Sequence, residues 1–204
     1  MIEPTKNYRL SDLVNGYIDR HHNKYRDSPS SSFFCESWPS SIGCEYQRMR
    51  KGVDMNISLL KSIIDRRNHN KSFLQNDTLV VHLRLGDVLD LPYYRDSHRK
   101  IAKLYVKPLV YYRRFNIPSN VRNAYIVTNE SYRAYSYPQR SVYYLSNVTN
   151  ILKQRGLHVR QYKGKSADED LLFMARSIFF VKSGGGFSNL VSHMIHLYNH
   201  TVIG

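Results

Sequence analysis

The sequence predicts an α/β fold with a mostly parallel sheet flanked by helices over residues 77–204. The first observation behind this prediction is residues 78–85, a near-continuous apolar run rich in β-branched side chains. Such a run is typical of a strand buried on both faces, as in a parallel sheet. The second observation is that short apolar segments alternate with segments of helical spacing up to the end of the chain.

Residues 1–76 are expected to form a smaller, mainly helical lobe. Apolar residues recur at helical spacing between Leu10 and Ile18, and the polar stretch 28–32 ends that helix. A second helical stretch is expected over residues 42–67. The buried stripe of its second half consists of Ile57, Leu59, Leu60, Ile63 and Ile64.

The elements of the larger domain follow in chain order. After the strand at 78–85 we expect a helix over 100–115, which Pro108 must restart or kink. The remaining expectations are strands at 123–128, 142–145 and 158–162, helices at 148–155 and 168–177, a strand at 178–181, a loop at 183–188 and a last helix at 189–198.

Composition excludes several classes of protein. The chain has 204 residues, which predicts one domain or two small lobes, and its 13% aromatic content argues against disorder. No apolar run approaches the roughly 18 residues of a membrane span. The first 20 residues are too charged for a secretory signal, so we expect a cytoplasmic protein. Two cysteines, Cys35 and Cys44, make no disulfide scaffold. They stand nine positions apart and could form one bridge, but we expect free thiols in a reducing compartment.

The charge balance points to an anionic partner. A formal net charge of +14 favours nucleic acid, an anionic membrane surface or a phosphate-bearing small molecule. However, the basic residues are scattered as doublets, and no zinc-finger spacing or aromatic RNA-binding strand is present. A basic nucleic-acid-binding protein without catalysis therefore remains the alternative to an enzyme that binds a phosphate-bearing substrate.

Two polar clusters are expected beyond the carboxyl ends of strands, where open α/β sheets bind ligands. The later cluster, residues 183–188, places three glycines between a strand and a helix. Glycines allow the backbone to approach an anion, and the N–H groups of the following helix point at it. The hydroxyls of Ser183 and Ser188 would add donors. The spacing is neither a Walker A loop nor a dinucleotide fingerprint, and a tight turn is the structural alternative.

The earlier cluster is His82-Leu-Arg84-Leu-Gly86-Asp87. His82 and Arg84 stand two residues apart, so both should project from the same face of the strand end. A guanidinium there can grip a pyrophosphate through two parallel hydrogen bonds. A salt bridge with Asp87 and a hydrogen-bonded core histidine are the structural alternatives.

Together the two clusters match a family. The pattern His-x-Arg-x-Gly-Asp, followed downstream by acidic residues 168–170, a Leu/Met-rich segment, an apolar strand and residues 183–188, resembles the fucosyltransferase-like nucleotide-sugar glycosyltransferases. The resemblance covers about residues 77–204. The Gly-Gly-Gly-Phe-Ser form is also similar to that of glycosyltransferase-like proteins from large algal viruses and algae, at least one of which uses xylose. This similarity makes a virus-encoded origin of the protein one of the possibilities that the resemblance implies.

The resemblance implies a GT-B-like fold, with residues 77–204 as the donor domain and residues 1–76 as a reduced acceptor lobe. It implies transfer of a sugar to a hydroxyl of a glycan or glycoprotein acceptor, with no metal and no cofactor besides the nucleotide-sugar co-substrate. Fucose from GDP-fucose is favoured, and UDP-xylose is the alternative donor. Leu85 stands where many fucosyltransferases carry a second Arg, which is a departure from the GDP-fucose pattern.

The resemblance also implies roles for individual residues. Arg84, with Gly86 beside it, would contact the donor diphosphate, and either Asp168 or Asp170 would bind the base or ribose. Thr128 and Asn129 occupy the place of a Ser/Thr-Asp pair. Phosphate would be held by Ser183, Gly184, Gly185, Gly186, Phe187 and Ser188.

The acceptor hydroxyl needs a base. Asp87 is the first candidate for this role, Asp90 is the next carboxylate along the chain, and His82 is the fallback. Arg84 would stabilise the charge that develops on the leaving phosphate.

Overall fold

The computed structural model describes residues 42, 44, 45, 57–69, 71, 73–90, 105–128, 139–164 and 166–203. The chain divides into two compact units: residues 1–72 with 165–172, and residues 73–164 with 173–204. The helix expected near the start of the chain lies outside the described residues. Residues 165–172, which the sequence places in the larger domain, group with the first unit.

The first unit contains α4 (Ile57–Arg67) and most of α9 (Ala167–Met174). Leu60, Ile63 and Ile64 of α4 are fully buried, as their helical spacing predicts. Arg66 and Arg67, in the last turn of α4, both pair with Glu45. These cations also stand where the partial negative charge of the helix end favours them.

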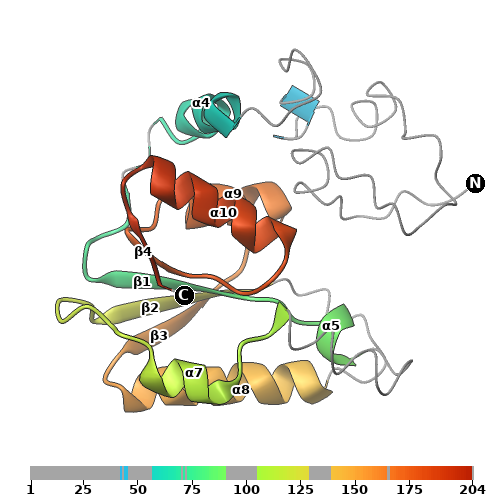
Figure 1. The fold of residues 1–204 in the computed structure, drawn as a ribbon, viewed down its shortest axis with the longest axis vertical. Helices are drawn as coiled ribbons and strands as arrows, with labels where there is room; N and C mark the ends of the chain where they lie inside the picture. Colours follow the sequence, from blue (N-terminus) through green and yellow to red (C-terminus); the bar gives the residue numbers. More distant parts are fainter. Residues whose placement is uncertain are drawn as a thin grey trace, which may run out of the picture. The chain divides into compact units, whose positions relative to one another are not determined.

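The second unit is built on a five-stranded sheet in the order β3-β2-β1-β4-β5, and every pair of neighbours is parallel. The strands are β1 (Thr78–Leu83), β2 (Asn123–Thr128), β3 (His158–Tyr162), β4 (Phe179–Val181) and β5 (Thr201–Ile203). The predicted α/β class with a parallel sheet is confirmed (Figure 1). All six residues of β1 are buried, as a central strand of such a sheet requires.

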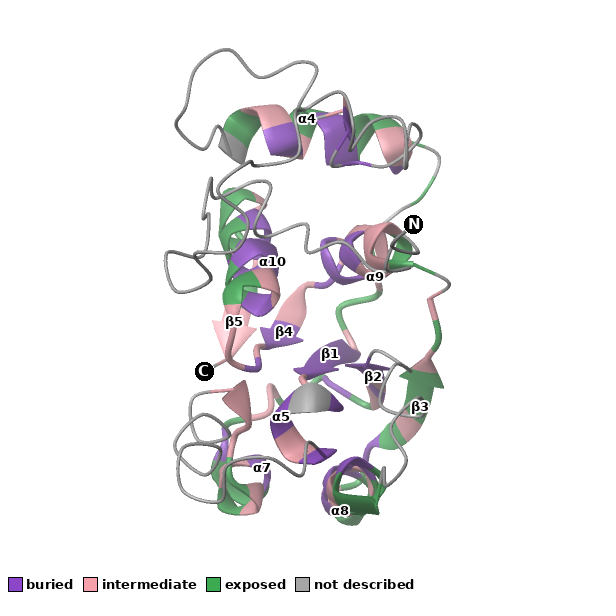
Figure 2. Cartoon of the chain, turned by 90° about the vertical axis from the view of Figure 1, so that its right-hand side faces the viewer, coloured by how far each residue is buried: buried purple, intermediate pink, exposed green. Residues whose placement is uncertain are grey.

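Helices cover both faces of this sheet (Figure 1). On one face lie α7 (Leu109–Arg114) and α8 (Gln139–Gln154), and on the other lies α10 (Gly186–Leu197). The core beneath α7 and α8 joins alternate residues of the strands to the inward side chains of the two helices. Each large aliphatic side chain that is fully buried there contributes roughly 1.5–3 kcal/mol to stability. In Figure 2 the central strand β1 is buried along its length, whereas β3 has exposed positions.

Most predicted elements of the second unit are confirmed, but some differ. The strand expected at 142–145 is wrong, because these residues belong to α8. Ser141, Leu145, Val148 and Leu152 are buried at helical spacing, while Tyr143 is 68% exposed. β5 was not predicted. Pro108 is the N-cap of the short α7, so the expectation that it begins a new segment is confirmed.

The expectation of free thiols is also wrong. Cys44 is disulfide-bonded, and Cys35, the other cysteine of the sequence, lies outside the described residues. Because disulfides persist mainly in oxidising compartments, the cysteines no longer support a reducing one. The cytoplasmic location stays a prediction. None of the helices in the described part is both long enough and apolar enough to span a membrane.

Candidate functional site

An open α/β sheet is expected to have a crevice where its strand order reverses, which in this sheet is between β1 and β4. The sequence of strands reverses there, so the chain leaves β1 toward one face of the sheet and β4 toward the other. Ligands of open α/β sheets bind beyond the carboxyl ends of the strands at this point. Both predicted clusters follow these two strands. The structure brings them together, because His82 Nδ1 and Ser183 Oγ share a hydrogen bond of 3.0 Å.

His82 is a buried, neutral histidine. Its side chain is 8% exposed, and its ring lies edge-on to Phe187 with the centroids 5.7 Å apart. Burial, and then the charge of Arg84, lowers the pKa of His82 from 6.5 to about 3. An imidazole with so low a pKa is a weak proton acceptor near neutral pH, but it still makes directional hydrogen bonds. These properties favour a positioning role, in which His82 holds the loop after β4 against β1.

Arg84 directly follows β1 and is half-buried. Its charge helps to lower the pKa of His82, so the guanidinium lies near the His82 ring. That the two side chains share one face of the strand end stays a prediction. Leu85, the next residue, is 5% exposed and belongs to the hydrophobic core. The position that carries a second Arg in many fucosyltransferases is therefore used for packing in this chain.

The backbone after Arg84 is fixed by α8. Gly86 has a positive φ of 76°, and its N–H donates to Ser141 Oγ at 2.9 Å. The short helix α5 (Asp87–Asp90) follows. Oδ1 of Asp90 accepts hydrogen bonds from the backbone N–H groups of Arg140 and Ser141, both at 3.1 Å.

Asp90 therefore caps the N-terminus of α8, a structural task for a buried carboxylate. This contact leaves Asp87 as the first candidate for the base. Asp87 begins α5, and its side chain lies outside the described part of the chain. Its predicted role remains a prediction.

α10 begins without a comparable cap. Its N-cap residue is Gly185, with φ 95° and ψ 163°, and no described side chain caps this end. The neighbouring Gly184 N–H donates to the Tyr105 carbonyl at 2.9 Å. A Cβ on Gly185 would lie 3.0 Å from the Tyr105 ring, so both the backbone conformation and the space require glycine.

The loop predicted at 183–188 is shorter than expected, because Gly186, Phe187 and Ser188 already form the first turn of α10. The first N–H groups of a helix have no partner within the helix, and they attract anions. The glycine turn places this helix end at the carboxyl edge of the sheet, beside His82.

Two predicted donors carry hydroxyls that have no partner among the described residues. Thr128 ends β2 next to Leu83 and is 7% exposed, and Ser188 is fully buried. Neither Thr128 Oγ1 nor Ser188 Oγ makes a hydrogen bond within the described ranges. Buried hydroxyls are usually bonded, so each such group calls for an explanation. Asn129, the neighbour of Thr128, lies outside the described residues.

Asp168 and Asp170 lie in the part of α9 that belongs to the first unit. Oδ2 of Asp168 accepts the backbone N–H of Ile42 at 2.7 Å and lies 3.8 Å from Arg67 Nη1. This carboxylate thus cross-links its own unit, and its role toward a base or ribose stays a prediction. Within the described residues, no three side chains of His, Cys, Asp or Glu gather into a group that could hold a metal ion.

Sequence reasoning missed the residues that hold the two loops. Tyr105 supports the glycine turn, and Ser141 supports Gly86. Asp90 was considered only as a base. These contacts join residues about 50 or more positions apart, as the pairs Gly86–Ser141 and Asp90–Arg140 show. No local pattern signals such a partnership.

Comparison of the sequence with protein families and with curated proteins gives no match. Two crystal structures of POFUT1 in complex with GDP are similar in structure. One has a TM-score of 0.34 and 9% identity over 82% of this chain and 57% of its own. The other has a TM-score of 0.36 and 10% identity over 89% and 60%. This chain thus spans less than two thirds of their length, and its fold class rests on its own strand order.

Proposed function

We propose that this protein is a nucleotide-sugar glycosyltransferase whose donor diphosphate binds in the crevice between β1 and β4. The observation that carries the proposal is the uncapped start of α10, which lies beside His82 at the point where the strand order reverses. The charge of Arg84 acts on the same histidine. A diphosphate would accept hydrogen bonds from the first N–H groups of α10 and from the guanidinium. The hydroxyls of Ser188 and Thr128 are further candidate donors.

The chemistry follows from this placement. The oxygen of an acceptor hydroxyl attacks the anomeric carbon, the bond from that carbon to the phosphate oxygen breaks, and its electron pair stays on the nucleoside diphosphate. The hydroxyl proton passes to a base, for which Asp87 is our candidate. Negative charge develops on the leaving phosphate, and Arg84 with the α10 amides would stabilise it there. His82 would position Ser183 and the turn instead of moving a proton.

The donor is proposed from the motif. His82-x-Arg84-x-Gly86-Asp87 favours GDP-fucose, and UDP-xylose remains the alternative donor. The acceptor would be a hydroxyl of a glycan or glycoprotein, with residues 1–76 as the acceptor lobe. We propose that the reaction needs no metal, since fixed cationic groups at the crevice would neutralise the leaving phosphate.

Thermal unfolding with nucleotides tests the proposal. GDP, UDP, ADP and CMP are each added to the purified chain, with and without EDTA. A ligand at about 100 times its Kd stabilises the folded state by about 2.7 kcal/mol, which raises Tm by roughly 5–10 °C. A shift with GDP alone supports the fucosyl donor, and a shift with UDP alone supports the xylosyl donor. Persistence of the shift in EDTA supports a metal-free site.

The matched variants are Arg84→Ala at the crevice and Arg113→Ala at an exposed position on α7. We expect Arg84→Ala to weaken nucleotide binding by about 30-fold or more, since a buried phosphate loses a charged partner. Arg113→Ala should leave the shift unchanged. If no nucleotide shifts Tm and the protein instead binds DNA or RNA in a salt-sensitive way, the alternative of a nucleic-acid-binding protein replaces the enzyme.

A further inference from the structure

β3 forms one edge of the sheet, and no described strand pairs with its outer side. His158, Arg160 and Gln161 are exposed along it. The His158 N–H donates to the Arg122 carbonyl at 2.8 Å, so His158 directs its backbone groups inward. Because this direction alternates along a strand, Val159 and Gln161 direct their N–H and C=O groups outward. Such an edge is a template for another strand.

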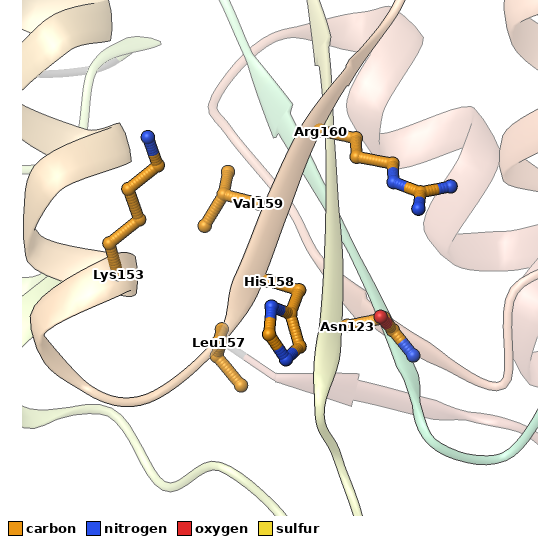
Figure 3. Close-up of a pocket in the computed structure, with 6 residues that line it drawn as sticks. All are labelled: Asn123, Lys153, Leu157, His158, Val159 and Arg160. Atoms are coloured by element: carbon orange, nitrogen blue, oxygen red, sulfur yellow. The ribbon is translucent and has the colours of Figure 1, made fainter.

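Cations flank this edge on both sides. A groove of about 570 Å³ runs along it, lined by Lys153, Arg160 and His158 together with Asn123, Leu157 and Val159. In Figure 3, Lys153 and Val159 lie on one side of β3 and Arg160 lies on the other. Among the described residues, neither Lys153 nor Arg160 has a carboxylate partner.

We propose that the outer edge of β3 binds an acidic polypeptide segment in extended conformation, as a sixth strand of the sheet. The outward N–H and C=O groups of Val159 and Gln161 would pair with its backbone. The side chains of the added strand would point alternately to the two faces of the sheet, so its carboxylates could pair with Lys153 on one face and with Arg160 on the other. Nucleic acid fits less well, since its phosphates supply only acceptors, whereas the outward carbonyls need donors. This inference is independent of the proposed glycosyl transfer.

Fluorescence anisotropy with a labelled ten-residue peptide of Val-Glu-Asp repeats tests the inference. This repeat puts carboxylates on both faces of the added strand. We expect the Lys153→Gln/Arg160→Gln double variant to bind about tenfold more weakly, because two exposed ion pairs are lost. The matched control is Arg113→Gln/Arg114→Gln, which removes the same charge from the exposed end of α7 and should bind like the parent protein.

A second probe separates strand pairing from simple charge attraction. The same peptide with an N-methyl group on every residue keeps its charge but loses the backbone N–H donors of both its edges, so it should bind at least tenfold more weakly. Equal binding of the N-methylated peptide would overturn the proposal. So would an unchanged Kd in the first double variant, no binding at about 1 mM peptide, or preferential binding of a single-stranded oligonucleotide at this edge. If no peptide binds, the cations instead serve to keep other strands from pairing with this edge.

Discussion

The N-termini of α8 and α10 lie at the same edge of the sheet but are completed in different ways. The third residue of each helix is a fully buried serine, Ser141 in α8 and Ser188 in α10. The start of α8 receives the carboxylate of Asp90, and Ser141 Oγ accepts the N–H of Gly86. The start of α10 has a glycine N-cap, and within the described part of the chain Ser188 Oγ has no partner.

The difference shows which helix end the protein caps with its own carboxylate, and it supports the proposal that the other end binds a ligand. Stability alone favours an anionic or hydroxyl cap at both ends, each worth about 1 kcal/mol. The protein supplies its own anion at α8, whereas at α10 it places a glycine turn, a neutral histidine and a nearby arginine. A site evolved for an external anion should show this pattern, because an internal carboxylate would compete with the ligand.

The largest expected effect is that of pH on stability through His82, which holds the turn before α10 by its hydrogen bond to Ser183. The pKa of His82 lies at about 3 in the folded state against 6.5 in the unfolded chain. The unfolded chain therefore binds the proton first, so the folded state loses stability as pH falls below 6.5, and the loss is complete near pH 3. At pH 4.5 the penalty should be roughly 2–3 kcal/mol.

His82→Asn removes this titration and keeps a group that can reach Ser183. We expect the variant to be about 1–2 kcal/mol less stable at pH 7.5 and more stable than the parent near pH 4.5. Urea unfolding across this pH range measures the crossover. His158→Asn, at an exposed position of β3, is the matched control. The pH dependence of its free energy of unfolding should be parallel to that of the parent protein. Parallel curves for His82→Asn would contradict a buried neutral imidazole.

The next largest expected effect is the loss of stability caused by alanine at two glycines with positive φ. Gly185 starts α10 with φ 95°, and Gly156 follows α8 with φ 83°. Alanine at Gly156 would meet nothing within 4 Å, whereas at Gly185 its Cβ would lie 3.0 Å from Tyr105. We expect Gly156→Ala to lower the free energy of unfolding by about 1 kcal/mol and Gly185→Ala by about 2 kcal/mol.

Nucleotide binding then separates the two helix ends. Gly185→Ala should weaken the nucleotide by about tenfold or more, because the turn that brings the α10 amides to the phosphate is displaced. Gly156→Ala should leave the Kd unchanged. Isothermal titration with the nucleotide that raises Tm most provides the measurement. Equal affinity in both variants would place the ligand away from the start of α10.

The sequence predicted the parts of this fold that depend on local patterns. β1 and β2 follow from apolar runs, and α10 follows the glycine turn as expected. Residues 142–145 were misassigned because Val, Tyr and Leu favour strands locally, while the buried side of α8 selects helix through Leu145 and Val148. β5 has only three residues and gains its place by pairing with β4.

The candidate site also has parts that local patterns predicted and parts that depend on long-range contacts. The spacing of His82 and Arg84 predicted that they share a face, and the glycines predicted a turn before a helix. Which carboxylate caps α8 was not predictable, because Asp90 and Ser141 stand 51 positions apart. Asp90 was considered only as a base, and it proved to be a cap. The Tyr105 ring leaves no space for a Cβ at Gly185, and Tyr105 lies in a segment that carries no recognisable motif.

The smallest expected effect on stability is that of Ser188→Ala, which is tested by comparing the two serines. Ser141→Ala removes the acceptor of a buried N–H, so Gly86 loses its partner, and we expect destabilisation by about 1–3 kcal/mol. Ser188→Ala removes a buried hydroxyl that has no partner among the described residues, so stability should stay within about 0.5 kcal/mol of the parent or rise.

Ligand binding should show the reverse order. If the Ser188 hydroxyl serves the donor phosphate, Ser188→Ala weakens the nucleotide by about fivefold, the value of one hydrogen bond, while Ser141→Ala changes Kd less than twofold. Chemical denaturation and titration of the same two proteins measure both orders. A stable Ser188→Ala variant with unchanged nucleotide affinity would remove this hydroxyl from the site, while a destabilised one would show that the hydroxyl has a structural partner. A loss of stability in Ser141→Ala together with a loss of nucleotide affinity in Ser188→Ala would therefore show that the start of α8 stabilises the fold and the start of α10 binds the ligand.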